Sequence, residues 1–273
     1  MARCAVRTAE RRNAGCCTWR LLQALGPPAI ARAGTLQCDV PTARLGAAVP
    51  ATTNPTMSHA GTLERIGELG VVPVIAIEQA AAAVPLADAL LAGGLPIVEI
   101  TFRTAVAAEV IHRITSERPH VIVGAGTVLT VANLEAAKAS GAVFAVAPGV
   151  NPQVVQHAKK IGLPFFPGVA TPTDIEQALS LGCTLLKFFP AEALGGVTMI
   201  DALAAPFRHA GVRFIPTGGV TPGNLESYLK LDTVAAVGGT WIAKKDDLSA
   251  GKWDEIRDRC RGAREIVSRA RAG

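Results

Sequence analysis

Short runs of apolar and β-branched residues recur along the chain from residue 71 onward, and each is followed by a stretch with helical spacing. Strand-forming runs that alternate with helical stretches are typical of parallel β–α–β units. Eight such units in about 200 residues favour a (β/α)8 barrel, the TIM barrel. The alternative is an open doubly wound sheet, but no G-x-G-x-x-G motif follows the first run. The predicted strands cover residues 71–77, 97–103, 120–126, 143–149, 163–169, 184–190, 213–219 and 234–240.

Residues 1–56 lack this rhythm and are rich in Ala, Arg, Pro and Thr. They hold seven arginines and two acidic residues, whereas the rest of the chain has as many basic as acidic side chains. The net charge of +5 therefore does not indicate nucleic-acid binding by the folded part. We interpret 1–56 as a disordered extension. It is either sequence upstream of a true start at Met57, the favoured reading, or an Arg-rich targeting segment. Residues 57–273 are predicted to form a single barrel domain.

The composition predicts a soluble, folded protein, which we expect in the cytoplasm. Hydrophobic residues make up 49% of the chain and charged residues only 18%, which argues against disorder. No apolar run approaches the roughly 18–20 residues that span a membrane. No C-x-x-C motif occurs and the histidines are scattered, so we predict no zinc site, no other metal and no cofactor.

Alternation along the second and sixth predicted strands places polar side chains inside the barrel. Glu99 and Arg103 share one face of the second strand, and the opposite face is wholly apolar. Lys187 and Phe189 share one face of the sixth. Active sites of these barrels lie at the C-terminal strand ends, so we expect a carboxylate, a guanidinium and a lysine to converge there. A buried structural ion-pair network is the alternative for these three residues.

Three further strand ends carry residues suited to substrate binding. Thr127 follows the third strand, and glycine pairs end the seventh (Gly218 and Gly219) and the eighth (Gly238 and Gly239). Loops after strands seven and eight are the usual phosphate site of this fold, where glycine lets backbone N–H groups approach the anion. The sequence therefore predicts a phosphate site at these two ends.

The lysine suggests a reaction type. Burial among apolar side chains favours the neutral amine of Lys187 over its ammonium form. A neutral amine attacks a ketone to form a Schiff base, which draws electrons from a neighbouring carbon–carbon bond as it breaks. Glu99 is the candidate proton carrier, and Arg103 can hold a substrate carboxylate with two hydrogen bonds. These residues predict a metal-free lysine lyase acting on a phosphorylated keto acid.

Several motifs in this order resemble the class I 2-keto-3-deoxy-6-phosphogluconate aldolase family, also called 4-hydroxy-2-oxoglutarate aldolase. They are VEITFRT, GAGTVL, APG, KFFPAE, GGV, PTGGVTPGN and GGTW, and the resemblance spans about residues 62–270. It implies a carbon–carbon lyase of the Entner–Doudoroff pathway that releases pyruvate and glyceraldehyde 3-phosphate. It also implies activity on 4-hydroxy-2-oxoglutarate, a small phosphorylated keto acid as the main partner, and a homotrimer.

The same resemblance assigns roles to individual residues. Lys187 matches the Schiff-base lysine, and Glu99 matches the general acid and base, which acts partly through water. Arg103 and Thr127 match the groups that hold the pyruvyl carboxylate, with Phe189 packed beside the imine. The phosphate end matches Thr217, Gly218, Gly219, Gly239 and Thr240. The family commonly has Ser where this chain has Thr240, so the extra methyl predicts a slightly altered phosphate pocket.

Other functions stay open at this point. One is a 2-keto-3-deoxy-6-phosphogalactonate aldolase, although KFFPAE and PTGGV fit the gluconate group better. Another is an isomerase of a phosphorylated metabolite that uses Glu99 as base and Lys187 only electrostatically. The last is a non-catalytic phosphosugar-binding barrel. Glu192, beyond Pro190, is interpreted as bracing its loop rather than as a catalytic acid.

Overall fold

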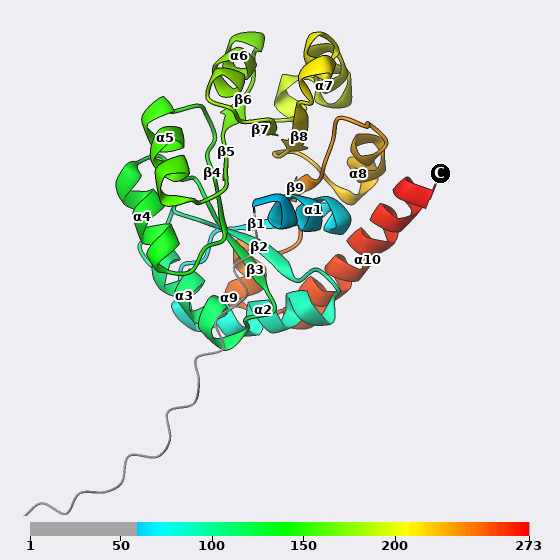
Figure 1. Ribbon diagram of the computed structural model, residues 1–273. Helices are drawn as coiled ribbons and strands as arrows, with labels where there is room; N and C mark the ends of the chain where they lie inside the picture. The colour runs from blue at the N-terminus through cyan, green and yellow to red at the C-terminus, as the bar shows by residue number, and fades with distance from the viewer. Residues whose placement is uncertain (1–58, 273) are drawn as a thin grey trace, which may run out of the picture. The chain divides into compact units, whose positions relative to one another are not determined.

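Parallel strands alternate with helices from Val71 onward, as the hydrophobic pattern predicts (Figure 1). The computed structural model describes residues 59–272, so the expected extension, residues 1–56, lies outside the described residues. The strands are β1 (Val71–Ile75), β2 (Ile97–Thr101), β3 (Ile122–Gly126), β4 (Phe144–Val146), β5 (Phe165–Phe166), β6 (Gly168–Val169), β7 (Leu185–Phe188), β8 (Arg213–Pro216) and β9 (Val237–Gly239).

Helices surround these strands, and α1 crosses in front of them in the view of Figure 1. The α-helices are α1 (His59–Leu69), α2 (Ala83–Ala92), α3 (Ala107–Glu117), α4 (Val131–Ala139), α5 (Pro152–Ile161), α6 (Pro172–Ser180), α7 (Gly196–Ala204), α8 (Pro222–Leu229), α9 (Lys245–Ser249) and α10 (Trp253–Ala272). Short 3₁₀ helices are η1 (Ala80–Ala82), η2 (Glu192–Leu194) and η3 (Ala205–Ala210). Between residues 59 and 272, none of the helices has the length and apolar character needed to cross a membrane.

All strand pairs are parallel, so the C-terminal ends of neighbouring strands lie on one side. A six-stranded sheet has the order β5-β4-β3-β2-β1-β9, and a three-stranded sheet has the order β6-β7-β8. Two isolated bridges, Phe214 with Val234 and Thr217 with Gly238, join β8 to the segment that contains β9. The predicted α/β class and the parallel strand direction are therefore confirmed.

The predicted strand over residues 163–169 is observed as two short strands, because Pro167 interrupts it. Proline has no N–H to donate to a strand ladder and is rarely found within a central strand. Phe165 pairs with Ala145 of β4, whereas Gly168 pairs with Lys187 of β7. Pro167 still accepts a hydrogen bond of 2.9 Å from the backbone N–H of Lys187. The chain thus passes from one sheet to the other at this proline.

Apolar side chains cover both faces of the strands, as expected where a parallel sheet is enclosed by helices. Every residue of β2 and β7 is buried. The rings of Phe144 and Phe166 lie 5.7 Å apart, and Phe188 meets Phe214 edge-on at 6.4 Å. These aromatic contacts pack neighbouring strands together outside the polar centre described below.

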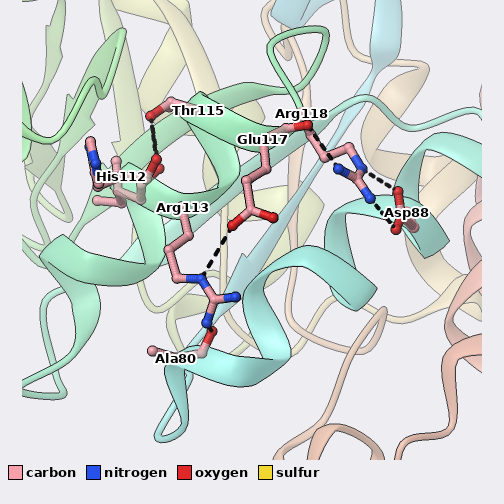
Figure 2. A network of polar contacts seen from close by, with 8 residues as sticks. Ala80, Asp88, His112, Arg113, Thr115, Glu117 and Arg118 are labelled. Atoms are coloured by element: carbon pink, nitrogen blue, oxygen red, sulfur yellow. Dashed lines mark hydrogen bonds and ion pairs between the residues drawn. The ribbon is translucent and has the colours of Figure 1, made fainter. Parts of the chain in front are cut away.

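Polar contacts close the outer surface between α2 and α3 (Figure 2). Arg118 donates two hydrogen bonds to the carboxylate of Asp88, at 2.5 and 2.9 Å. Arg113 donates to the carbonyl of Ala80 at 2.9 Å and to Glu117 at 3.4 Å. Ion pairs between exposed side chains contribute little to stability, because water screens both charges. They therefore orient the two helices more than they stabilise the fold.

Candidate active site

Lys187 and Glu99 meet inside the fold although their strands belong to different sheets. Lys187 lies on β7 and Glu99 on β2, and the Lys187 Nζ lies 3.1 Å from Glu99 Oε1. Lys187 is 6% exposed and Glu99 is 3% exposed. A buried pair of opposite charges carries a large desolvation penalty, and transfer of the proton from the amine to the carboxylate leaves both groups neutral. The contact therefore gives Lys187 a direct route to its nucleophilic form.

The carboxylate of Glu99 occupies space that a glycine leaves open. Gly126 ends β3, and a Cβ at this position would lie 2.2 Å from Glu99 Oε1. No side chain can be present at residue 126 without displacing that oxygen. A glycine inside a predicted strand often marks such a close approach, so the glycine that ends GAG (residues 124–126) indicated that another group lies close to the backbone here. Sequence reasoning missed the role of Gly126.

Arg103 lies beyond the end of the strand that was predicted to contain it. Strand β2 ends at Thr101, and Arg103 lies in the following turn with its side chain exposed. The strand predicted over 97–103 is therefore two residues too long, and because the alternation of inward and outward side chains stops where the strand stops, it does not determine the direction of Arg103. Thr127, just after β3, has a φ of 55° and is the one non-glycine residue between 59 and 272 with positive φ. Both residues remain at the C-terminal ends of their strands.

Phe189 follows β7 and lies beside the lysine. Its ring centroid is 5.7 Å from Lys187 Nζ, within the range of a cation–π contact, and the residue is 38% exposed. A Cβ placed on Gly218 would lie 3.4 Å from this ring. Lys187, Phe189 and Gly218 therefore form a continuous series of neighbours from the buried amine to the loop after β8.

One glycine pair, Gly218 and Gly219, follows β8, and the other, Gly238 and Gly239, forms the end of β9. Gly218 and Gly219 have φ values of 99° and 82°, a left-handed conformation that glycine adopts without strain. Thr217 is buried, and a Cβ at Gly238 would lie 2.1 Å from its Oγ1. Gly239 is buried and Thr240 is exposed in the next turn, so the predicted phosphate residues are brought to one region by adjacent strand ends.

Glu192 braces the loop after β7, as the sequence predicted. Its carboxylate accepts a hydrogen bond from the hydroxyl of Tyr228 on α8, and its backbone N–H donates to Gly218 O at 3.0 Å. Burial and the hydrogen bond to Glu192 both raise the pKa of Tyr228 well above its usual value. Tyr228 was not singled out from the sequence, because nothing in its local pattern reveals a partner on another element.

No group of three or more His, Cys, Asp or Glu side chains between residues 59 and 272 could hold a metal ion. The reactive groups at the centre are an amine and a carboxylate. Such a pair can perform nucleophilic addition and proton transfer, which are the steps of lysine-dependent carbonyl chemistry.

Comparison with known proteins agrees with this chemistry. The family model described as KDPG and KHG aldolase matches residues 63–259; KDPG is 2-keto-3-deoxy-6-phosphogluconate and KHG is 4-hydroxy-2-oxoglutarate. The chain belongs to this aldolase family. It is therefore a carbon–carbon lyase, and the family membership covers β1 to β9 together with the Lys187 and Glu99 positions.

Two relatives and one solved structure illustrate the similarity to other aldolases. A 2-dehydro-3-deoxy-phosphogluconate aldolase of Treponema pallidum is 47% identical over 193 residues, which cover 71% of this chain and 91% of the relative. The KHG/KDPG aldolase of Escherichia coli K12 is 43% identical over 195 residues, which cover 71% and 91% respectively. The KDPG aldolase of Legionella pneumophila, solved with pyruvate captured as a covalent carbinolamine, superposes with a TM-score of 0.70 at 37% identity; the match covers 74% of this chain and 97% of that structure.

Proposed function

We propose that this aldolase uses Lys187 to cleave 2-keto-3-deoxy-6-phosphogluconate (KDPG) to pyruvate and glyceraldehyde 3-phosphate. It would cleave 4-hydroxy-2-oxoglutarate (KHG) in the same way, to pyruvate and glyoxylate. The observation that carries the proposal is the buried contact of 3.1 Å between Lys187 Nζ and Glu99 Oε1. The names of the relatives and the covalent carbinolamine in the Legionella enzyme support it.

The contact between the two side chains supports a complete reaction sequence. Glu99 takes a proton from Lys187, and the neutral amine adds to the keto carbon C2; Glu99 then gives this proton to the C2 hydroxyl, which leaves as water, and a protonated imine remains. Electrons of the C3–C4 bond move to this imine while Glu99 takes the proton of the C4 hydroxyl, which releases the aldehyde. Glu99 returns a proton to C3 of the enamine. Water adds to the imine and gives its proton to Glu99, and pyruvate leaves as the free amine of Lys187 is restored.

Two groups of residues would hold the ends of the substrate. Arg103 and Thr127, at the ends of β2 and β3, would bind the carboxylate next to the keto group, with Phe189 packed against the imine. The phosphate would bind where β8 and β9 end, at Thr217, Gly218, Gly219, Gly239 and Thr240. The backbone N–H of Gly219 has no acceptor among residues 59–272, which leaves it available to an anion.

The architecture and assembly of the chain form part of the same proposal. We take residues 57–273 as one closed (β/α)8 barrel, supported by the pairing of β9 with β1 and by the bridges from β8 to the β9 segment. Residues 1–56 would be an extension of this domain. A cytoplasmic homotrimer follows from the family resemblance, and light scattering of the purified protein measures its size.

Borohydride trapping tests the mechanism. Incubation with pyruvate and borohydride should add an irreversible mass to the peptide that carries Lys187. Lys187→Ala should abolish the adduct, whereas Lys159→Ala, which removes an exposed lysine on α5, should leave it intact. An adduct that persists in Lys187→Ala contradicts the proposed mechanism. Parallel assays of pyruvate release from KDPG and KHG test the substrates.

A further inference from the structure

A pair of polar side chains lies behind the loop that carries Gly218 and Gly219. Tyr228 is the single tyrosine of the chain and is fully buried, and its hydroxyl donates to the carboxylate of Glu192. Tyr228 lies near the end of α8, and its hydroxyl lies beside Glu192 and Gly196, in the segment that follows β7. Neither side chain takes part in the reaction sequence described above.

Backbone contacts join the loop after β7 to the loop after β8. Ala191 N–H donates to Thr217 O at 2.9 Å, and Glu192 N–H donates to Gly218 O at 3.0 Å. The side-chain stem of Glu192 lies directly against the next glycine, since a Cβ at Gly219 would be 2.5 Å from Glu192 Cβ. The position of Glu192 therefore determines where the backbone of Gly218 and Gly219 lies.

Two adjacent glycines with left-handed φ form a backbone with little conformational preference of its own. A loop of this kind needs outside contacts to hold one conformation. Glu192 brings a negative charge close to it, and an unsatisfied carboxylate turned toward the loop would repel an anion. The Tyr228 hydroxyl holds that carboxylate, with a charge-assisted hydrogen bond, on the side of α8.

We propose that Tyr228 and Glu192 are positioning residues that fix the Gly218–Gly219 loop in the conformation that binds the substrate phosphate. This inference rests on the proposed function, because it assigns the loop to the phosphate of KDPG. The two side chains touch neither the phosphate nor the reacting carbons. They act through the loop backbone, so their loss should weaken binding of the phosphorylated substrate more than it slows the chemical step at Lys187.

Steady-state kinetics on two substrates separate this role from general damage. Tyr228→Phe keeps the ring and removes only the hydroxyl. It should raise KM for KDPG by about three- to tenfold, the factor that corresponds to one hydrogen bond. The increase for KHG, which has no phosphate, should be clearly smaller. Glu192→Ala should act like Tyr228→Phe, and Glu192→Gln, which keeps an acceptor oxygen, should be milder.

Glu226→Gln is the matched control, because it neutralises a carboxylate on the same helix whose partner is the exposed Lys230. This variant should retain wild-type KM values on both substrates. If Tyr228→Phe and Glu192→Ala also leave the KM for KDPG unchanged, or raise KM equally for both substrates, the positioning role is wrong. A wild-type enzyme that cleaves neither substrate would instead contradict the proposed function.

The single tyrosine supplies a second measurement that needs no variant. Protein labelled with ¹³C at the tyrosine Cζ should give one resonance, from Tyr228, and titration with inorganic phosphate should shift it. Glu226→Gln should show the same shift, whereas Glu192→Ala should lose most of it. A resonance that does not move while phosphate competitively inhibits cleavage of KDPG would overturn the inference and leave the proposed function intact.

Discussion

Gly126→Ala tests the geometry at Lys187 directly, because Gly126 has no side chain where the carboxyl group of Glu99 lies. The added Cβ would be 2.2 Å from Glu99 Oε1, 2.7 Å from its Cγ and 2.8 Å from its Cδ. Non-bonded heavy atoms attract each other at separations of about 3.5 Å and repel at shorter ones. The carboxyl group of Glu99 therefore has to move by about 1 Å. Strand β3 pairs with β2 along its whole length, which prevents Gly126 from moving away instead.

The size of the effect follows from this displacement. Lys187 Nζ and Glu99 Oε1 are 3.1 Å apart, and a shift of about 1 Å takes them beyond hydrogen-bond distance. Misplacement of a reacting group by about 1 Å costs about 100-fold in rate. We therefore expect kcat for KDPG to fall by about two orders of magnitude, which is about 2.7 kcal/mol of transition-state stabilisation. KM should change much less, since the added Cβ meets Glu99 and none of the residues proposed to bind the ends of the substrate.

The assay couples pyruvate release to lactate dehydrogenase, and two other glycines supply the controls. Gly262→Ala on α10 adds a methyl group that meets no atom within 4 Å, so activity should be unchanged. Gly124→Ala lies on the same strand as Gly126, but its Cβ would strike the Phe144 ring at 2.1 Å. Gly124→Ala should lower the free energy of unfolding, whereas kcat per folded molecule should change little. If Gly126→Ala retains wild-type kcat, or if Gly124→Ala loses as much kcat per folded molecule, the argument from Glu99 fails.

Three other changes test separate features. Gly219→Asp places a side chain and a negative charge on the glycine loop, and should raise KM for KDPG by at least about tenfold while KHG is little affected; equal losses would indicate damage to the fold. Asp247→Asn removes the negative charge that accepts a hydrogen bond of 2.5 Å from Arg259. It should lower the free energy of unfolding, measured in urea at pH 7, by about 1.5–3 kcal/mol. Dialysis against EDTA should leave cleavage of KDPG at its full rate, and activity that returns only with an added metal would contradict a lysine mechanism.

The pH dependence of the Asp247→Asn effect has a definite sign. The hydrogen bond from Arg259 holds the pKa of Asp247 below its usual value. The stabilisation is therefore complete above the unfolded-state value of about 3.9 and is lost as the pH falls through the lower folded-state value. Unfolding experiments at pH 7, 5 and 3 should show the difference between wild type and Asp247→Asn shrinking at the acid end. A difference that stays constant would mean that the charge of Asp247 contributes nothing.

Strand periodicity was enough to predict the central pair. Alternation placed Lys187 and Glu99 on inward faces, and parallel strands brought both toward the same end of the fold, where they now make a contact of 3.1 Å. The same rule does not determine the direction of Arg103, because it assumed a strand that continues to residue 103. The strand ends at Thr101, and the phase of a strand says nothing about a side chain beyond its last paired residue.

Contacts between distant segments could not be predicted in the same way. The spacing of hydrophobic residues cannot predict the hydrogen bond from Tyr228 to Glu192, because the two residues are 36 positions apart on different elements. Gly126 gave a visible signal as a glycine within a strand, but the pattern alone cannot name the group that fills the space. The left-handed backbone of Thr127 likewise depends on the surrounding fold rather than on the residue type.

The passage of the chain between sheets at Pro167 has a consequence for how activity arises during folding. Glu99 is carried by the six-stranded sheet and Lys187 by the three-stranded sheet, so a partly folded molecule that has built only one of them holds half of the proton-transfer pair. Catalytic turnover then reports the docking of the two sheets rather than the formation of either. In a refolding experiment, recovery of the Schiff base with pyruvate should lag behind recovery of helical signal, because the amine gains its proton acceptor only when the last interface between the sheets closes.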